Sequence, residues 1–161
     1  MLDKLNFLLK TFFEWSCIMM PEVKIMQSDE EIMLTFHTVK QLRPHLEKTE
    51  YVGKIRRLMG KHDYTLIAVI EDSDVMAVAG YRLTESLAWD QYLYVDDLIT
   101  NESSRKNGYA QILWNWLIDE ASKKGCKQFH LDSGVNRYDA HRFYLKNGLD
   151  ITCHHFQKNS D

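Results

Sequence analysis

The residues best suited to chemistry lie in a polar turn that joins a predicted strand to a predicted helix. Arg105 and Lys106 supply two positive charges, and Gly108 supplies a backbone that can approach a ligand closely. The first N–H groups of the following helix have no intrahelical acceptor and carry partial positive charge. Such a turn is suited to an anion, for example a pyrophosphate. It is neither a P-loop nor a dinucleotide fingerprint, because the chain contains no G-x-x-x-x-G-K-[ST] and no G-x-G-x-x-G.

Cysteine and histidine spacing argues against a metal centre. The three cysteines form no C-x-x-C pair, and the seven histidines include no i,i+4 pair with a glutamate. Adjacent His154 and His155 would point to opposite faces of a strand. We therefore expect no metal ion, and we interpret the cysteines as reduced, buried thiols of a cytoplasmic protein.

Hydrophobic periodicity predicts the elements that position this turn. Ser28 and Glu31 form a capping box at the start of the first helix of the main domain. The strand, turn and helix of the segment 92–124 lead into a further strand, 126–131. The two strands joined by this crossover, 92–100 and 126–131, should therefore be parallel. The order of elements predicts an α+β (mixed α/β) domain around one sheet. The predicted strands are 23–26, 66–70, 75–83, 92–100, 126–131 and 151–156, and the predicted helices are 28–44, 51–60, 110–124 and 138–146.

Length and charge limit the function classes. The 161 residues suffice for one domain, and 20 Lys+Arg against 23 Asp+Glu give a formal net charge of −3. This balance provides no overall electrostatic attraction for nucleic acid. Residues 1–20 have apolar positions at helical spacing, interrupted by charges, which predicts an amphipathic helix rather than a membrane span or a signal peptide. This segment could pack on the domain or a second subunit, lie on a membrane surface, or be an upstream extension; packing or extension is favoured because Lys and Arg are sparse.

Two segments resemble the GNAT superfamily of acyl-CoA-dependent N-acyltransferases. Residues 105–110, RKNGYA, fit the pyrophosphate loop R-x-x-G-x-[GA] of that family. Residues 136–149, NRYDAHRFYLKNGL, resemble its N-x3-A-x2-[FL]-Y-x-[KR]-x-G-[FL] helix. The resemblance covers roughly residues 22–156 and implies a central mixed, mostly antiparallel sheet with two splayed parallel strands, flanked by helices. It implies an acetyltransferase domain over 21–161, with 1–20 outside it.

The resemblance also implies how an acyl-CoA would be bound. Asn136 would bind the cofactor as the motif asparagine does, and Tyr144 matches the tyrosine that protonates the leaving thiolate. Backbone groups that would hold the acyl group and pantetheine are those of Leu98, Ile99 and Thr100. Backbone N–H groups that would hold the pyrophosphate are those of Arg105, Lys106, Asn107, Gly108, Tyr109 and Ala110.

Three residues of the strand 92–100 are candidates for the base that deprotonates an amine. They are Tyr94, Asp96 and Asp97. Strand alternation predicts Tyr94 and Asp96 on one face and Asp97 on the other. Each acid could instead only hydrogen-bond a neighbouring strand or loop. A dedicated base could also be unnecessary, because the fraction of the acceptor that is already a free amine, replenished through water, could suffice.

These expectations combine into a functional hypothesis. The chain is expected to move the acetyl group of acetyl-CoA directly to a primary amine, with catalysis by Tyr144 and by Asp96 or Asp97. The acceptor could be a small molecule or a peptide. No nucleic-acid partner and no membrane span are expected, and the protein would be a cytoplasmic monomer or homodimer. Two alternatives are a non-catalytic acetyl-CoA-binding sensor or interaction module, and a different donor such as succinyl-CoA, which the two local acids disfavour.

Overall fold

One five-stranded sheet organises the domain. The computed structural model describes residues 20–160, and the strand order is β1-β2-β3-β4-β5. All neighbouring strands are antiparallel except β4 and β5, which are parallel. The predicted mixed, mostly antiparallel sheet is therefore confirmed. The strands are β1 (Glu22–Ile25), β2 (Tyr64–Glu71), β3 (Asp74–Ser86), β4 (Asp90–Thr100) and β5 (Gln128–Leu131).

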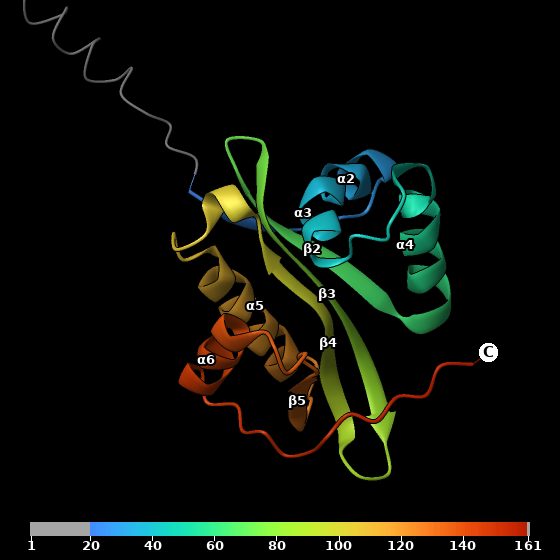
Figure 1. Ribbon diagram of the computed structural model, residues 1–161, viewed down its shortest axis with the longest axis vertical. Coiled ribbons are helices and arrows are strands. Elements are labelled where there is room, and N and C mark those ends of the chain that lie inside the picture. The colour runs from blue at the N-terminus through green and yellow to red at the C-terminus, as the bar shows by residue number, and fades with distance from the viewer. Residues whose placement is uncertain (1–19, 161) are drawn as a thin grey trace, which may run out of the picture.

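Helices cover both faces of this sheet (Figure 1). On one face lie α2 (Asp29–Leu34), α3 (Phe36–Leu42) and α4 (Lys48–His62). On the other face lies α5 (Tyr109–Lys123), with α6 (Tyr138–Lys146) beside it. A short 3-10 turn, η1 (Glu102–Ser104), connects β4 to the loop that precedes α5. The crossover from β4 through α5 to β5 accounts for the parallel pair, as the sequence predicts.

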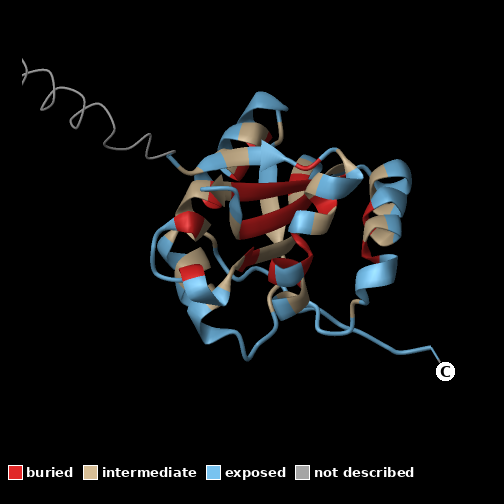
Figure 2. Ribbon diagram, turned by 90° about the horizontal axis from the view of Figure 1, so that it is seen from above, coloured by how far each residue is buried: buried red, intermediate tan, exposed pale blue. Residues whose placement is uncertain are grey.

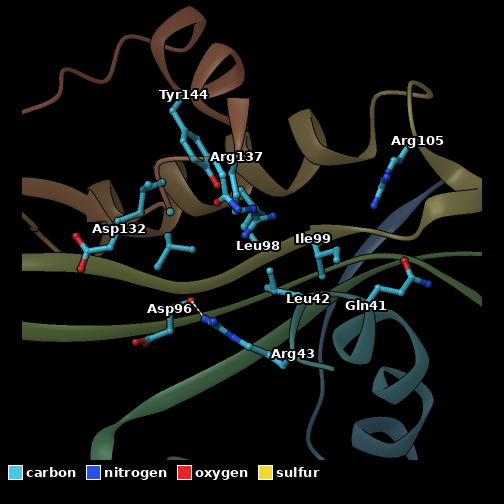
Figure 3. Close-up of a pocket in the computed structure, with 14 residues that line it drawn as sticks. Gln41, Leu42, Arg43, Asp96, Leu98, Ile99, Arg105, Asp132, Arg137 and Tyr144 are labelled. Carbon is cyan, nitrogen blue, oxygen red and sulfur yellow. Dashed lines mark hydrogen bonds between the residues drawn. The ribbon is translucent and has the colours of Figure 1, made fainter. Parts of the chain in front are cut away.

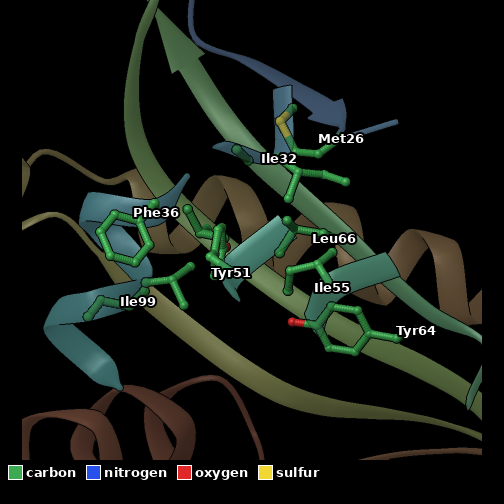
Figure 4. Packing of buried hydrophobic residues seen from close by; sticks show 11 residues of the cluster. Met26, Ile32, Phe36, Tyr51, Ile55, Tyr64, Leu66 and Ile99 are labelled. Carbon is green, nitrogen blue, oxygen red and sulfur yellow. The ribbon is translucent and has the colours of Figure 1, made fainter. Parts of the chain in front are cut away.

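The core has two halves because side chains of a strand alternate between the faces of the sheet. Leu66 and Ala68 of β2 pack with the α2–α4 helices, whereas Ile67 and Val69 pack against α5. The buried residues accordingly line the middle of the molecule, while exposed residues cover its outer surface (Figure 2). Figure 4 shows the half-core on the α2–α4 side.

Local signals set the helix boundaries. The capping box is present, since Glu31 N–H donates to Ser28 Oγ at 3.2 Å and Ser28 N–H donates to Glu31 Oε2 at 2.9 Å. The helix predicted over 28–44 is divided into α2 and α3 at Thr35. The buried Thr35 hydroxyl donates to the Ile32 carbonyl at 2.7 Å and lies 2.7 Å from the Tyr51 hydroxyl on α4. These contacts hold the junction of α2 and α3 against α4.

A β-bulge in β4 changes the direction of that strand. Gly80 of β3 pairs with Asp97, but the next residue, Tyr81, pairs with Val95, so Asp96 has no partner on β3. A bulge of this kind bends its strand and increases the local twist. The parallel pairing of β4 with β5 covers only Tyr92 to Val95, so the two strands separate directly after it. The bulge and the separation therefore coincide.

Residues 151–156 are not a strand, so the prediction of a sixth strand is wrong. They belong to no helix or strand and are exposed, and the sheet of the described residues ends at β5. Alternating β-prone side chains indicate only a suitable surface, whereas a strand also needs a partner for its backbone groups. The helix expected within residues 1–20 lies outside the described part of the chain, except for the exposed Met20. None of the helices within residues 20–160 is long and apolar enough to span a membrane.

The packing of side chains against the sheet can be tested most directly at Gly80. A Cβ atom at residue 80 would overlap the hydroxyl oxygen of the buried Tyr64. Gly80→Ala should therefore lower the free energy of unfolding by about 1–3 kcal/mol, the usual effect of overpacking. Urea denaturation measures this change.

The matched control is Gly60→Ala in α4, where a Cβ meets no atom within 4 Å. This change should raise stability by roughly 0.5–1 kcal/mol, because alanine favours the helix over glycine. Equal effects of the two substitutions would contradict the close approach of Tyr64 to Gly80.

Candidate active site

A cleft opens where β4 and β5 separate, and we call it the strand cleft (Figure 3). Its volume is about 400 Å³. Its walls come from the end of α3, from β4, from the loop before α5, from the end of β5, from the loop between β5 and α6, and from α6 itself. The lining residues are Gln41, Leu42, Arg43, Val95, Asp96, Leu98, Ile99, Arg105, Leu131, Asp132, Gly134, Asn136, Arg137 and Tyr144.

One wall of the strand cleft is a strand edge without a neighbouring strand. Beyond Val95, β4 is hydrogen-bonded to β3 only, among the strands of residues 20–160. Leu98 and Ile99 line the cleft, while Thr100 at the end of the strand does not. The free edge offers backbone N–H and C=O groups to an extended ligand such as a pantetheine chain.

The polar turn has backbone geometry that is suited to an anion. Gly108 is the N-cap residue of α5 with a φ of 88°, a conformation that glycine adopts without strain, and no side chain caps this helix. The N–H groups of the first turn therefore remain available to a ligand. Arg105 lines the cleft and lies 3.4 Å from Glu102, whereas Lys106 and Asn107 are exposed and do not line it.

Tyr109 and Ala110 begin α5, and only their backbone fits the predicted role. The Tyr109 side chain is buried against the sheet, and its hydroxyl donates a hydrogen bond to Glu71. This hydrogen bond is the main cause of the raised pKa of the Tyr109 phenol. Tyr109 can thus contribute its N–H group to an anion while its side chain anchors the helix.

Tyr144 enters the strand cleft from α6. Its ring lies 6.1 Å from the ring of Trp114 on α5, at an interplanar angle of 30°. The neighbouring Phe143 packs edge-on against the same tryptophan at 5.6 Å. Burial raises the pKa of the Tyr144 phenol, and the nearby charge of Arg137 opposes part of this increase. The phenol is therefore protonated at neutral pH and can act as a hydrogen-bond or proton donor.

The bulge brings Asp96 and Asp97 to the same face of the sheet. The prediction that they lie on opposite faces is wrong, because the extra residue at the bulge interrupts strand alternation. Asp96 accepts two hydrogen bonds from Arg82, both of 2.7 Å. Asp97 accepts from Arg43 Nε at 2.8 Å and from the Tyr64 hydroxyl at 3.0 Å. Both carboxylates are thus engaged by protein donors.

These five residues form a connected group that we call the bulge cluster: Arg43, Tyr64, Arg82, Asp96 and Asp97. Arg43 also donates from Nη2 to the carbonyl of Asp96 at 3.0 Å, which satisfies a backbone acceptor of the bulge. The hydrogen bonds to Asp96 raise the pKa of the Arg82 guanidinium. Burial raises the pKa of Tyr64 far above its usual value, so its phenol remains a donor to Asp97.

A second cleft lies on the other side of the bulge cluster, beside the end of α4, and we call it the helix cleft. Its volume is also about 400 Å³. Leu58 and His62 of α4 line it together with the bulge cluster. Arg43 and Asp96 line both clefts, so they form a shared wall between the two.

The Tyr94 side chain contacts residues on both sides of β4. Its hydroxyl donates to Asp132 at 2.6 Å, and Arg82 lies over its ring at 5.3 Å from the centroid. Burial is the first cause of the raised pKa of Tyr94, and the hydrogen bond to Asp132 is the second. Asp132 also lies 3.2 Å from His155 Nδ1 in the C-terminal segment. Tyr94 itself lines neither cleft, although its contacts Asp132 and Arg82 line the strand cleft and the helix cleft, respectively.

Some residues of the site have no clear signal in the sequence. Arg43 meets Asp97 across 54 positions, and Tyr64 meets it across 33, so no local pattern links them. Arg137, in contrast, directly follows Asn136, and both line the strand cleft. Within residues 20–160, no three histidine, cysteine, aspartate or glutamate side chains are grouped as a metal site would require.

Comparison with known proteins places this geometry in a family. Residues 25–149 match the family model described as the acetyltransferase (GNAT) family. A curated relative is the uncharacterized N-acetyltransferase YhdJ of Bacillus subtilis (strain 168). It is 31% identical over 140 residues, which cover 86% of this chain and 99% of the relative.

Solved structures share the fold at low sequence identity. A transcriptional regulator from Bacillus halodurans C-125 has a TM-score of 0.77 and 18% identity, with 87% of this chain and 99% of that chain covered. The aminoglycoside acetyltransferase AAC(6')-Iy, in complex with a bisubstrate analogue, CoA-S-monomethyl-acetylneamine, has a TM-score of 0.75 and 13% identity, with 88% and 98% covered. The match of the family model over most of the chain and the curated relative show that this chain belongs to the GNAT family and is an acyl-CoA-dependent acetyltransferase.

Proposed function

We propose that the protein transfers the acetyl group of acetyl-CoA to a primary amine, directly and with Tyr144 as the general acid. The observation that carries the proposal is the position of the Tyr144 side chain in the strand cleft, between the free edge of β4 and the loop that holds Asn136. A phenol with a raised pKa in this place is a suitable proton donor for a leaving thiolate. We also propose that the protein acts in the cytoplasm, as a monomer or homodimer.

The chain's own residues fit acetyl-CoA in three parts. The first-turn N–H groups of α5 and the Arg105 side chain are suited to the pyrophosphate. The free edge of β4 at Leu98 and Ile99 is suited to the pantetheine and acetyl groups, and Asn136 can donate to the same chain from the opposite wall. AAC(6')-Iy, which shares the fold, has been solved in complex with CoA.

The transfer is balanced without a covalent enzyme intermediate. The amine nitrogen attacks the thioester carbonyl, a C–N bond forms and the C–S bond breaks. The electron pair of the broken bond leaves on sulfur, which takes the proton of the Tyr144 hydroxyl. The amine loses its own proton to water, and solvent returns a proton to Tyr144. The developing negative charge on the thioester oxygen needs a donor, which the N–H groups of the free β4 edge can supply.

We propose that the acceptor amine, of a small molecule or a peptide, reaches the thioester from the helix cleft, because this cleft shares the wall of Arg43 and Asp96 with the strand cleft. In this arrangement Asp96 and Asp97 hold the shared wall of the two clefts in place. Protonation of Asp96 would weaken its two hydrogen bonds with Arg82, which makes this carboxylate a poor base.

The test is thiol release from acetyl-CoA in the presence of a broad panel of primary amines, with the acetylated amine identified by mass spectrometry. At least one amine should be acetylated in amounts that match the thiol released. Binding of acetyl-CoA without acetylation of any amine would instead favour a non-catalytic acetyl-CoA-binding sensor.

The role of Tyr144 predicts a selective kinetic defect. Tyr144→Phe should lower kcat by about 100-fold, the usual scale for loss of a general acid, while the Kd for acetyl-CoA changes less than about twofold. The matched control is Tyr138→Phe, because Tyr138 lies on the same helix and is 65% exposed. An unchanged kcat in Tyr144→Phe, with chemistry limiting the rate, would remove Tyr144 as the acid.

Asp96 could act as a base or could only position the wall between the clefts. The two roles can be distinguished by breaking the ion pair between Asp96 and Arg82 from either side. Asp96→Asn removes the carboxylate, and Arg82→Met removes its partner. If Asp96 only positions the wall, both variants should lower kcat by similar factors, at most about tenfold. A loss of about 100-fold or more in Asp96→Asn alone would identify Asp96 as the base.

A further inference from the structure

Three arginines line the strand cleft, and they differ in how their charge is used. Arg43 forms an ion pair with Asp97 at 2.8 Å, and Arg105 lies 3.4 Å from Glu102. Arg137, in contrast, has no carboxylate within 4.0 Å of its guanidinium among residues 20–160. Of the three, Arg137 therefore has its charge most fully available to a bound anion.

Arg137 and Tyr144 come to the same part of the cleft from one helix. Arg137 is the N-cap residue of α6, and Tyr144 lies two turns further along. A helical side chain points back toward the N-terminus of its helix, which directs the Tyr144 ring toward Arg137. Figure 3 shows the two side chains next to each other, with Arg105 at the distant end of the cleft. The charge of Arg137 also acts on Tyr144, whose pKa it lowers against the larger effect of burial.

We propose that Arg137 stabilises the coenzyme A sulfur as it becomes a thiolate, so that it is a catalytic residue that acts beside Tyr144. This proposal rests on the proposed function, since it assumes that the thioester lies at Tyr144. When the C–S bond breaks, the electron pair remains on sulfur, and guanidinium N–H groups donate hydrogen bonds to it. Arginine keeps its own protons at all relevant pH values, so the proton that sulfur finally receives is that of Tyr144.

The division of labour follows from the chemistry of the two groups. A phenol can deliver a proton but carries no charge, whereas a guanidinium carries a permanent charge but delivers no proton. With Arg137 in place, negative charge can develop on sulfur before proton transfer is complete. Electrostatic stabilisation of this kind acts where the charge develops in the transition state.

A phosphate of coenzyme A is the other anion that Arg137 could bind, and a pair of ligands separates the two cases. Coenzyme A and desulfo-coenzyme A, in which hydrogen replaces the thiol group, carry the same phosphates. Affinities of both ligands are to be measured by calorimetry from pH 7 to pH 10, for the wild type and for Arg137→Met, Arg137→Lys and Arg105→Met. The Arg137 side chain is exposed and forms no hydrogen bond within residues 20–160, so its substitution should leave the fold intact.

At the alkaline end, the wild type should bind coenzyme A about tenfold more tightly than desulfo-coenzyme A, on the scale of one charged hydrogen bond. Arg137→Met should abolish this difference, and Arg137→Lys should retain much of it. Arg105→Met should weaken both ligands equally, because it acts at the pyrophosphate. Equal weakening of both ligands by Arg137→Met, or no change in either affinity, would overturn the proposal.

The bound thiol provides a second readout that needs no acceptor. Thiolate absorbance in the ultraviolet, with the desulfo-coenzyme A complex as reference, gives the pKa of the bound thiol. This pKa should be about one unit higher in Arg137→Met than in the wild type, and an identical pKa would refute the role of Arg137.

Failure of the proposed function would look different. If the wild type shows the Arg137-dependent thiolate effect but acetylates no amine, the proposed function is disproved, while stabilisation of the thiolate by Arg137 is supported. Acetylation without the thiolate effect would disprove only the latter. A wild-type protein that does not bind coenzyme A would overturn both.

Discussion

The bulge at Asp96 is the constraint on which the site depends. A strand that continued regularly past Val95 could remain paired with β5, and the two strands would then leave no space between them. The extra residue bends β4 at the point where its pairing with β5 ends. The free backbone edge, the strand cleft and the opening toward α6 all follow from this one irregularity.

The bulge is held by side chains from three different parts of the chain. Arg82 binds it from the neighbouring strand, Arg43 from the end of α3, and Tyr64 from the start of β2. Each ion pair is partly exposed, and such pairs contribute little to stability individually. Their importance lies in geometry, because a planar guanidinium with two hydrogen bonds fixes both the position and the orientation of its carboxylate.

Local patterns predicted much of the fold and part of the site. The capping box of Ser28 and Glu31, the turn with Gly108 and the crossover through α5 all depend on residues close together in sequence. Tyr144, which the second motif singles out, lines the strand cleft. The shared face of Asp96 and Asp97 could not be predicted, because a bulge is set by how two strands pair and not by the pattern of one strand. The false strand at 151–156 has the same origin, since alternation carries no information about a partner.

The close approach of Tyr64 to Gly80 has a consequence for how related sequences can differ. The ring occupies the space that any side chain at position 80 would need, so the two positions cannot change independently. A relative with a larger residue at position 80 must have a smaller or redirected residue at position 64. Such a relative would also lack the phenol that binds Asp97, and its bulge would need another anchor. The two positions should therefore covary within the family, and the residues found there should indicate how each member holds its cleft open.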